Sequence, residues 1–204
     1  MDRGGNVIAE LEADHREVEQ IFQQIEAQPV GDRRRWELAD ELTREFVRHS
    51  VAEEMHLYPA VREYVEEGAM LADKELADHA RVERMLKDLE DLNADDPRFN
   101  DLVAKLRLEV ASHVRDEESR LFPKLAASCT PQKLDELGEF VRRSKETAPT
   151  RPHPSMPTTP PVSKLLAPGV GMVDRLRDAL RRRRGEGLNS QGERRQPHLP
   201  LRSH

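Results

Sequence analysis

Residues 49–59 read HSVAEEMHLYP, and residues 113–123 read HVRDEESRLFP. Each stretch places a glutamate four residues after a histidine, so the two side chains share one face of a helix. Each stretch then ends on a leucine, an aromatic residue and a proline. The two stretches are 64 residues apart, which indicates an internal repeat.

The same offset relates further residues on either side of these stretches. Asp14-His15 recurs as Asp78-His79, and several apolar positions match in the same register. Each copy is too small to bury an apolar face alone, so we expect two helical hairpins that pack on each other. The apolar matches are Val18 with Val82, Leu38 with Leu102, and Leu42 with Leu106.

Steps of three and four between core-type residues predict four amphipathic helices. Breaks at residues 29–32, near Gly68 and at residues 93–97 give short connections, which favour antiparallel neighbours. Pro59 and Pro123 should kink or end their helices. The sequence therefore predicts an all-α fold, an up-down-up-down four-helix bundle. Its stripes are Ile8, Leu11, His15, Val18, Phe22, Ile25; Leu38, Leu42, Phe46, His49, Glu53; Leu76, His79, Val82, Leu86, Leu89; and Leu102, Leu106, Val110, His113, Glu117.

The C-terminal part of the chain has a different composition. Thr130-Pro131 is typical of a helix start and predicts a short fifth helix on the outside of the bundle. Nine of the 14 prolines lie in residues 146–204, which predicts a linker and a mostly disordered tail. Residues 172–184 place apolar side chains on one helical face among arginines. We expect a bundle with its fifth helix over residues 1–145 and a Pro-rich linker and basic tail over 146–204.

Charge is divided unevenly between these two parts. Residues 146–204 hold 11 Lys or Arg and 5 Asp or Glu, whereas the rest holds 22 and 34. The acidic main domain argues against nucleic-acid binding, because phosphate recognition needs clustered positive charge. The tail is either solvated or binds an acidic partner, the bundle itself or an anionic lipid surface.

The sequence also predicts where the protein resides. It has no apolar run of membrane-spanning length, and its N-terminus lacks the features of a secretory signal. Cys129 is the only cysteine, so a disulfide framework is excluded and any metal must be held by histidine and carboxylate. We expect a soluble protein of the cytoplasm with no transmembrane segment.

Histidine and glutamate occupy positions where a bundle core needs apolar residues. Burying four imidazoles and two carboxylates would be costly unless divalent ions coordinate them. The glutamates are placed to bridge two ions, each also bound by two imidazoles. Mixed nitrogen and oxygen donors favour iron, with manganese or zinc as alternatives. The predicted metal ligands are His15, His49, Glu53, His79, His113 and Glu117.

The order H, HxxxE, H, HxxxE, with L-[YF]-P after each HxxxE, resembles the hemerythrin-like HHE cation-binding family over residues 7–127. The resemblance implies a non-haem bundle with two carboxylate-bridged iron ions that binds or reacts with oxygen, nitric oxide or peroxide, or handles iron. By this resemblance, oxygen-carrying members of the family would hold their metals with five histidines and two carboxylates. In this sequence Glu75 stands where the fifth histidine would fall. The set is more similar to members tied to nitric oxide or iron-cluster stress, peroxide breakdown or iron sensing.

Five residues beside the predicted ligands each have two interpretations. Glu54 and Glu118 lie about 100° around the helix from the neighbouring glutamates, so they either support ligands or lie on the surface. His56 and Glu75 are either additional metal-site residues or structural ones. Tyr58 is either a core residue or an electron or proton donor.

Two classes of function fit this sequence. The first is a di-iron protein that binds or reacts with a small oxidant or diatomic, and it includes an oxidoreductase acting on peroxide or nitric oxide. The second is an iron or oxygen sensor or adaptor, in which the bundle regulates a partner through the tail. A metal-free structural bundle is the least favoured, because six buried polar groups would then have to satisfy one another.

Overall fold

Four long α-helices form the body of the molecule. The computed structural model describes residues 5–151, and the part of the tail beyond residue 151, which we expect to be disordered, lies outside them. Two π-helical turns, η1 (Glu53–Leu57) and η2 (Glu117–Leu121), each lead into a short helix. The α-helices are α1 (Val7–Ala27), α2 (Arg33–Ala52), α3 (Tyr58–Tyr64), α4 (Gly68–Glu90), α5 (Pro97–Asp116), α6 (Phe122–Ser128) and α7 (Pro131–Thr147).

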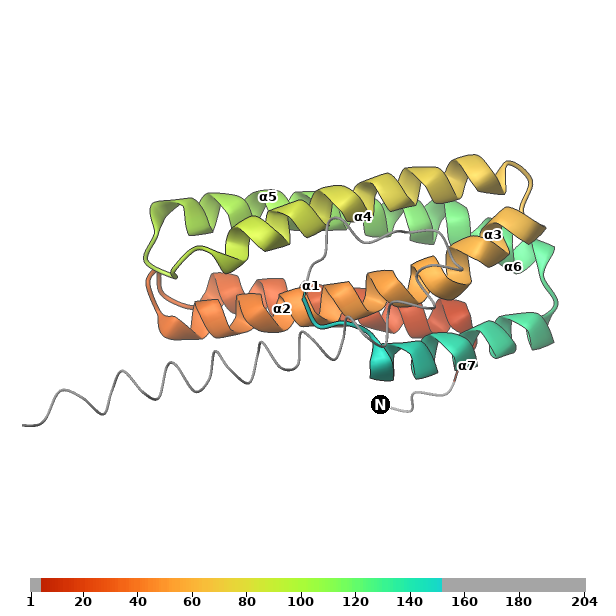
Figure 1. Ribbon diagram of the computed structural model, residues 1–204, viewed down its shortest axis with the longest axis horizontal. Coiled ribbons are helices and arrows are strands. Elements are labelled where there is room, and N and C mark those ends of the chain that lie inside the picture. The colour runs from red at the N-terminus through yellow and green to blue at the C-terminus, as the bar shows by residue number, and fades with distance from the viewer. Residues whose placement is uncertain (1–4, 152–204) are drawn as a thin grey trace, which may run out of the picture.

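The long helices form two antiparallel pairs. In Figure 1, α4 and α5 lie side by side above α1 and α2, and α7 runs along the outside of the α1–α2 pair. This arrangement confirms the predicted all-α bundle, its breaks and its outer fifth helix. None of the described helices combines the length and the apolar run that a membrane span requires.

Side chains at the helix starts fix where the helices begin. The Asn6 side chain accepts backbone hydrogen bonds from Ile8 and Ala9 at 3.0 and 3.1 Å. Asp32, Asp96 and Thr130 cap α2, α5 and α7 in the same way. These caps satisfy N–H groups that the first turn leaves without partners.

The turn from α3 into α4 depends on a glycine. Glu67 has a left-handed backbone with φ of 58°, and Gly68 follows it at the start of α4. A Cβ atom at Gly68 would lie 2.0 Å from the carbonyl oxygen of Val61. A larger residue there would push α3 away from α4.

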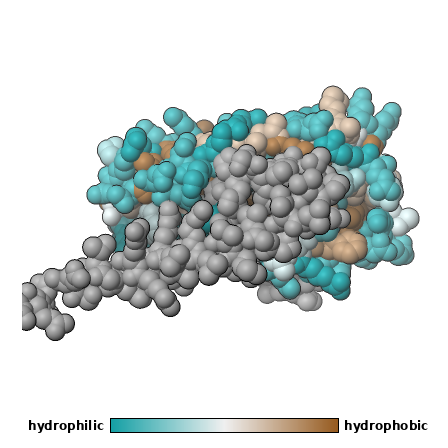
Figure 2. Space-filling model, viewed as in Figure 1, coloured by the Kyte–Doolittle hydropathy of each residue, from teal (hydrophilic) through white to brown (hydrophobic). Residues whose placement is uncertain are grey.

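The core has two large apolar clusters with a polar layer between them, and a third, small cluster lies near the end of the described residues. One large cluster surrounds Leu11 and Leu57, and the other surrounds Phe22 and Phe46. Within α1, His15 lies between Leu11 of the first cluster and Val18 of the second. The outer surface in Figure 2 is mostly hydrophilic where it shows described residues. The clusters therefore hold the helices together on both sides of a buried polar layer.

Pro59 and Pro123 distort their helices, as predicted, and do so through the π-turns. A proline has no N–H to donate, and its ring clashes with the carbonyl of residue i−4 in an α-helix. In η1, the N–H of Tyr58 bonds to the carbonyl of Glu53, five residues back. In η2, the N–H of Phe122 bonds to the carbonyl of Glu117. Each π-turn begins at a glutamate predicted as a metal ligand.

Candidate metal centre

The structure brings all six predicted ligands into one buried volume. Each is at most 4% exposed. The four long helices contribute one histidine each, and the two π-turns contribute one glutamate each. Donor atoms within three overlapping groups lie less than 4.8 Å apart: His15, His49, Glu53 and Glu117; Glu53, His79 and His113; and Glu75, His113 and Glu117.

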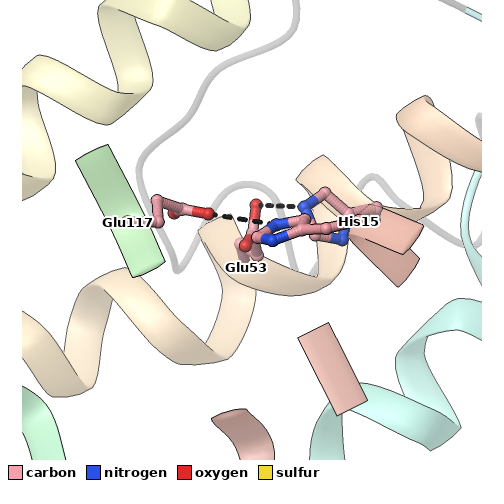
Figure 3. A group of neighbouring side chains, drawn as sticks. His15, Glu53 and Glu117 are labelled. Carbon is pink, nitrogen blue, oxygen red and sulfur yellow. Dashed lines mark ion pairs between the residues drawn. The ribbon is translucent and has the colours of Figure 1, made fainter. Parts of the chain in front are cut away.

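Each of the two glutamates lies between histidines of the two sequence repeats. Glu53 Oε2 is 3.1 Å from His49 Nε2 and 3.3 Å from His79 Nε2. Glu117 Oε2 is 3.4 Å from His15 Nε2 and 3.5 Å from His113 Nε2. Figure 3 shows the carboxyl groups of Glu53 and Glu117 pointing into the same space as the His15 ring. This geometry suits carboxylates that bridge two sites.

The histidines form two close pairs. The ring centroids of His15 and His49 are 4.9 Å apart, and those of His79 and His113 are 4.8 Å apart. The pairs agree with the predicted division of four imidazoles into two groups of two.

Every histidine of the cluster directs its second ring nitrogen to a carboxylate. A carboxylate can only accept, so each Nδ1 donates the hydrogen bond and each Nε2 is free to face the interior. Such a contact fixes the ring and makes Nε2 a better metal donor. The Nδ1–oxygen distances are 2.9 Å for His15 to Glu118, 3.2 Å for His49 to Asp14, 3.0 Å for His79 to Glu54 and 2.9 Å for His113 to Glu75.

These contacts favour the supporting interpretation of Glu54 and Glu118, whereas Glu75 both contacts His113 and belongs to one of the three donor groups. Glu54 and Glu118 support histidines across the bundle, and they do so symmetrically in the two repeats. Glu75 breaks the symmetry: the repeat would pair His113 with Asp78, but Asp78 binds Lys74 at 2.9 Å instead. Glu75 is 2% exposed and takes the place of Asp78 behind His113.

The electrostatics of the cluster favour positive charge between the glutamates. Burial alone would lower the pKa of His49, but Glu53 and Asp14 outweigh burial and raise that pKa to about 10. Burial is likewise outweighed at His79, where Glu53 and Glu54 raise the pKa well above its ordinary value. Burial would raise the pKa of Glu53, but His49 and His79 hold it well below its ordinary value.

The donor atoms themselves test whether a metal fits these residues. His15 Nε2, His49 Nε2, Glu53 Oε1 and Glu117 Oε2 are buried and make no well-formed hydrogen bond, although both nitrogens face carboxylates of the cluster. Buried polar atoms without hydrogen bonds are costly and rare, and here they converge on one volume. Imidazole nitrogen together with carboxylate oxygen is a donor set for divalent transition metals. The residues therefore fit metal cations.

Tyr58 is a core residue that also makes polar contacts within the cluster. Its side chain is buried, as predicted for a core residue, but its hydroxyl donates to Glu117 Oε1 at 3.0 Å and lies 3.1 Å from His79 Nε2. Burial and the charges of Glu117 and Glu53 raise the pKa of Tyr58 well above its ordinary value. The repeat partner Phe122 instead stacks on His15, with ring centroids 5.8 Å apart.

His56 lies apart from the cluster. Its Nε2 is 2.5 Å from the hydroxyl of Ser144, and its ring stacks on Phe140 with centroids 5.5 Å apart. Both partners belong to α7. The structure thus favours the structural interpretation of His56.

Fold and site together define a class: helical-bundle proteins whose buried histidines and carboxylates are suited to binding metal cations. The chain belongs to the hemerythrin HHE cation-binding domain family, whose family model matches residues 6–125. The resemblance seen in the sequence is therefore confirmed. α7 lies beyond the matched residues.

Relatives and a solved structure agree with this membership. An uncharacterized hemerythrin-like protein of Schizosaccharomyces pombe is 29% identical over 169 residues, covering 82% of each chain. A DNA nickase of Nostoc is 27% identical over 141 residues, which span 69% of this chain and 39% of the nickase. The crystal structure of a hemerythrin HHE cation binding domain-containing protein from Mycobacterium kansasii is 25% identical, with a TM-score of 0.62 over 69% of this chain and 85% of that one.

Proposed function

We propose that the chain binds two non-haem iron ions, bridged by Glu53 and Glu117, and that this centre binds or reacts with oxygen, nitric oxide or peroxide. The convergence of four imidazoles and two buried carboxylates, with donor atoms lacking hydrogen bonds, carries the proposal. Family membership supports cation binding. The mixed donor set supports iron.

The ligand side chains would give each ion two imidazoles and the shared carboxylates of Glu53 and Glu117. His15 and His49 would bind one ion and His79 and His113 the other, because each pair lies within 5 Å between ring centroids. When bound, the iron pair supplies Lewis acidity and electrons to a small ligand. The carboxylates at each Nδ1 keep the imidazole rings oriented and their Nε2 atoms directed inward.

Neighbouring side chains control protons and water at the centre. Tyr58 holds its proton on the hydroxyl and donates it in a hydrogen bond to Glu117 Oε1. Phe46 packs its ring against His79 and His113, with centroids 5.9 and 6.5 Å away. Phe122 covers His15 on another side. These rings exclude water, which strengthens the electrostatic interactions inside.

Metal analysis and rapid mixing test this proposal together. Protein reconstituted with ferrous iron without oxygen should contain close to two iron ions per chain, because the glutamates bridge two histidine pairs. Stopped-flow spectra after mixing with oxygen, nitric oxide or peroxide should then show an adduct or turnover with at least one of them. One tightly held zinc with no iron uptake, or no reaction with any of the three, would refute the proposal.

One observation favours a sensor or adaptor as the alternative function. α7 leads directly into the basic tail, and its Lys145 forms an ion pair with Asp14, which in turn binds His49. A change in the metal centre on metal binding would then be transmitted to the tail through α7. We expect limited proteolysis within residues 152–204 to differ between iron-loaded and metal-free protein, whereas a pure oxidoreductase would show no difference. We also propose a cytoplasmic location for the protein. The basic tail would bind an acidic partner or an anionic surface.

A further inference from the structure

A groove with an apolar floor runs along the α1–α5 edge of the bundle. It encloses about 410 Å³. Val18, Phe22 and Val110 form its buried floor, and His15 lies in its wall. A water molecule occupies about 30 Å³ of liquid, so the groove has room for several molecules of diatomic size.

The corresponding edge in the other repeat is more tightly filled, and the pocket on it holds only about 10 Å³. The 64-residue offset relates the α1–α5 edge to the α4–α2 edge. Val110 corresponds there to Phe46, whose larger ring is 2% exposed. Exposed Ala111 corresponds to Val47, which is buried under Ala148. Within residues 5–151 the two related edges therefore differ, and the α1–α5 edge has the larger opening, beside the predicted ligand His15.

Polar contacts separate the groove from the metal-binding cluster. Glu118 accepts from His15 Nδ1 at 2.9 Å and from Arg16 at 2.6 Å. The Arg16 side chain is 59% exposed. The opposite nitrogen of the same ring, His15 Nε2, lies 3.4 Å from Glu117 Oε2 inside the cluster. A single imidazole and a solvent-reachable ion pair thus stand between the groove and the cluster.

We propose that the α1–α5 groove is the path by which small uncharged ligands reach the metals. The inference rests on the proposed function, since it concerns the ligands of that same centre. The apolar floor favours uncharged molecules such as oxygen, nitric oxide and hydrogen peroxide over ions, because an ion would lose its hydration there.

Filling the groove tests the path. Ala111→Trp adds an indole to an exposed position in the groove wall, so the fold should tolerate it. We expect the rate constant for nitric oxide binding to the ferrous full-length protein to fall about tenfold or more, with iron content unchanged. Ala104→Trp is the matched control: it makes the same change at an exposed position of α5, two turns away, and should keep the wild-type rate. Ala111→Leu should give an intermediate rate.

Xenon provides a readout that needs no metal. Crystals of the metal-free full-length protein under xenon pressure should show xenon on the groove floor, and Ala111→Trp crystals should not. The path would be overturned if crystals of Ala111→Trp show the groove filled and this variant still binds nitric oxide at the wild-type rate. That result would leave the proposed function intact. If the wild-type iron protein forms no nitric oxide adduct, the same rates are measured with oxygen or peroxide, and absence of reaction with all three would count instead against the proposed function itself.

Discussion

Glu117 and Glu118 are neighbours of equal charge with different surroundings. Glu117 is fully buried, and its Oε2 lies between His15 and His113. The side chain of Glu118 is 23% exposed and holds His15 from behind, together with Arg16. The pair therefore separates a direct ligand role from a supporting one.

Alanine variants of these two residues should lose metal to different degrees. Glu117→Ala removes a bridging carboxylate, so we expect its iron content to fall to one ion or fewer even at saturating iron. Glu118→Ala leaves the ligands in place and should weaken affinity by about 10–100-fold, the usual effect of losing a carboxylate behind a histidine ligand. Iron titrations monitored by absorbance would measure both. Equal losses, or a greater loss in Glu118→Ala, would show that the ligand register in α5 and η2 is wrong.

Sequence reasoning at the residue scale identified the six converging side chains but not all of their supports. The repeat pattern pointed to them because polar residues recurred at core positions. It could not show that Glu75 replaces Asp78 behind His113, because the repeat pairs His113 with Asp78, whose carboxylate instead contacts Lys74 and Arg81. Nor could it show the hydroxyl contacts of Tyr58, since its repeat partner is a phenylalanine.

The π-turns are the element-scale feature that sequence reasoning described only in part. Pro59 and Pro123 predicted that their helices kink or end, and a π-turn interrupts the α-helix just before each proline. The form of the interruption depends on whether the backbone carbonyls before each proline bond to an N–H five residues ahead instead of four. Reasoning from a single sequence does not reveal that choice. The π-turns rotate the residues after each glutamate, so that Tyr58 and Phe122 face the cluster.

α7 supports the metal centre although it lies outside the residues matched by the family model. Lys145 forms an ion pair with Asp14, the carboxylate behind His49. Burial would raise the pKa of Asp14, but His49 and Lys145 outweigh burial and lower it, so the carboxylate stays charged. Lys145 of α7 thus helps to orient the predicted ligand His49 through Asp14.

Removing that cation should weaken metal retention. Lys145→Met keeps the length of the side chain, and we expect iron release to a chelator to become about tenfold faster, because Asp14 no longer holds His49 firmly. Lys145→Arg should restore most of the retention. Lys133→Met is the control: this half-buried lysine in the first turn of α7 pairs with Glu136 instead of Asp14, so its loss should not change iron release. If Lys145→Met lowers the melting temperature of the metal-free protein but leaves iron release unchanged, its role is structural only.

At the scale of the whole molecule, contacts with the bundle continue a few residues beyond the boundary that composition predicts near residue 145. α7 ends at Thr147, and Ala148 packs against Val47 and Val51. Arg151 forms ion pairs with Asp40 and Glu90. Proline content marked this segment as a linker, since composition does not report which residues return to the core. The division of the chain near residue 145 stays a prediction.

Two truncations should separate the bundle from the tail. Removing residues 152–204 should leave the melting temperature and iron content unchanged, because the proline content of this segment predicts a linker that separates the tail from the bundle. Removing residues 146–204 also deletes Ala148 and Arg151, and should cost about 1–2 kcal/mol of stability, a usual size for the loss of a few buried contacts. Thermal unfolding by circular dichroism measures both effects. Loss of iron or of helical signal in the shorter deletion would show that residues 152–204 belong to the fold.

The central claim is that six side chains from four helices and two π-turns hold a pair of iron ions. Anomalous diffraction at the iron edge, from crystals of the iron-loaded protein, tests it most directly. The account predicts two peaks, one beside the Nε2 atoms of His15 and His49 and the other beside those of His79 and His113, with Glu53 and Glu117 between them. A single peak, a peak elsewhere, or no peak with the six side chains still packed on one another would contradict it.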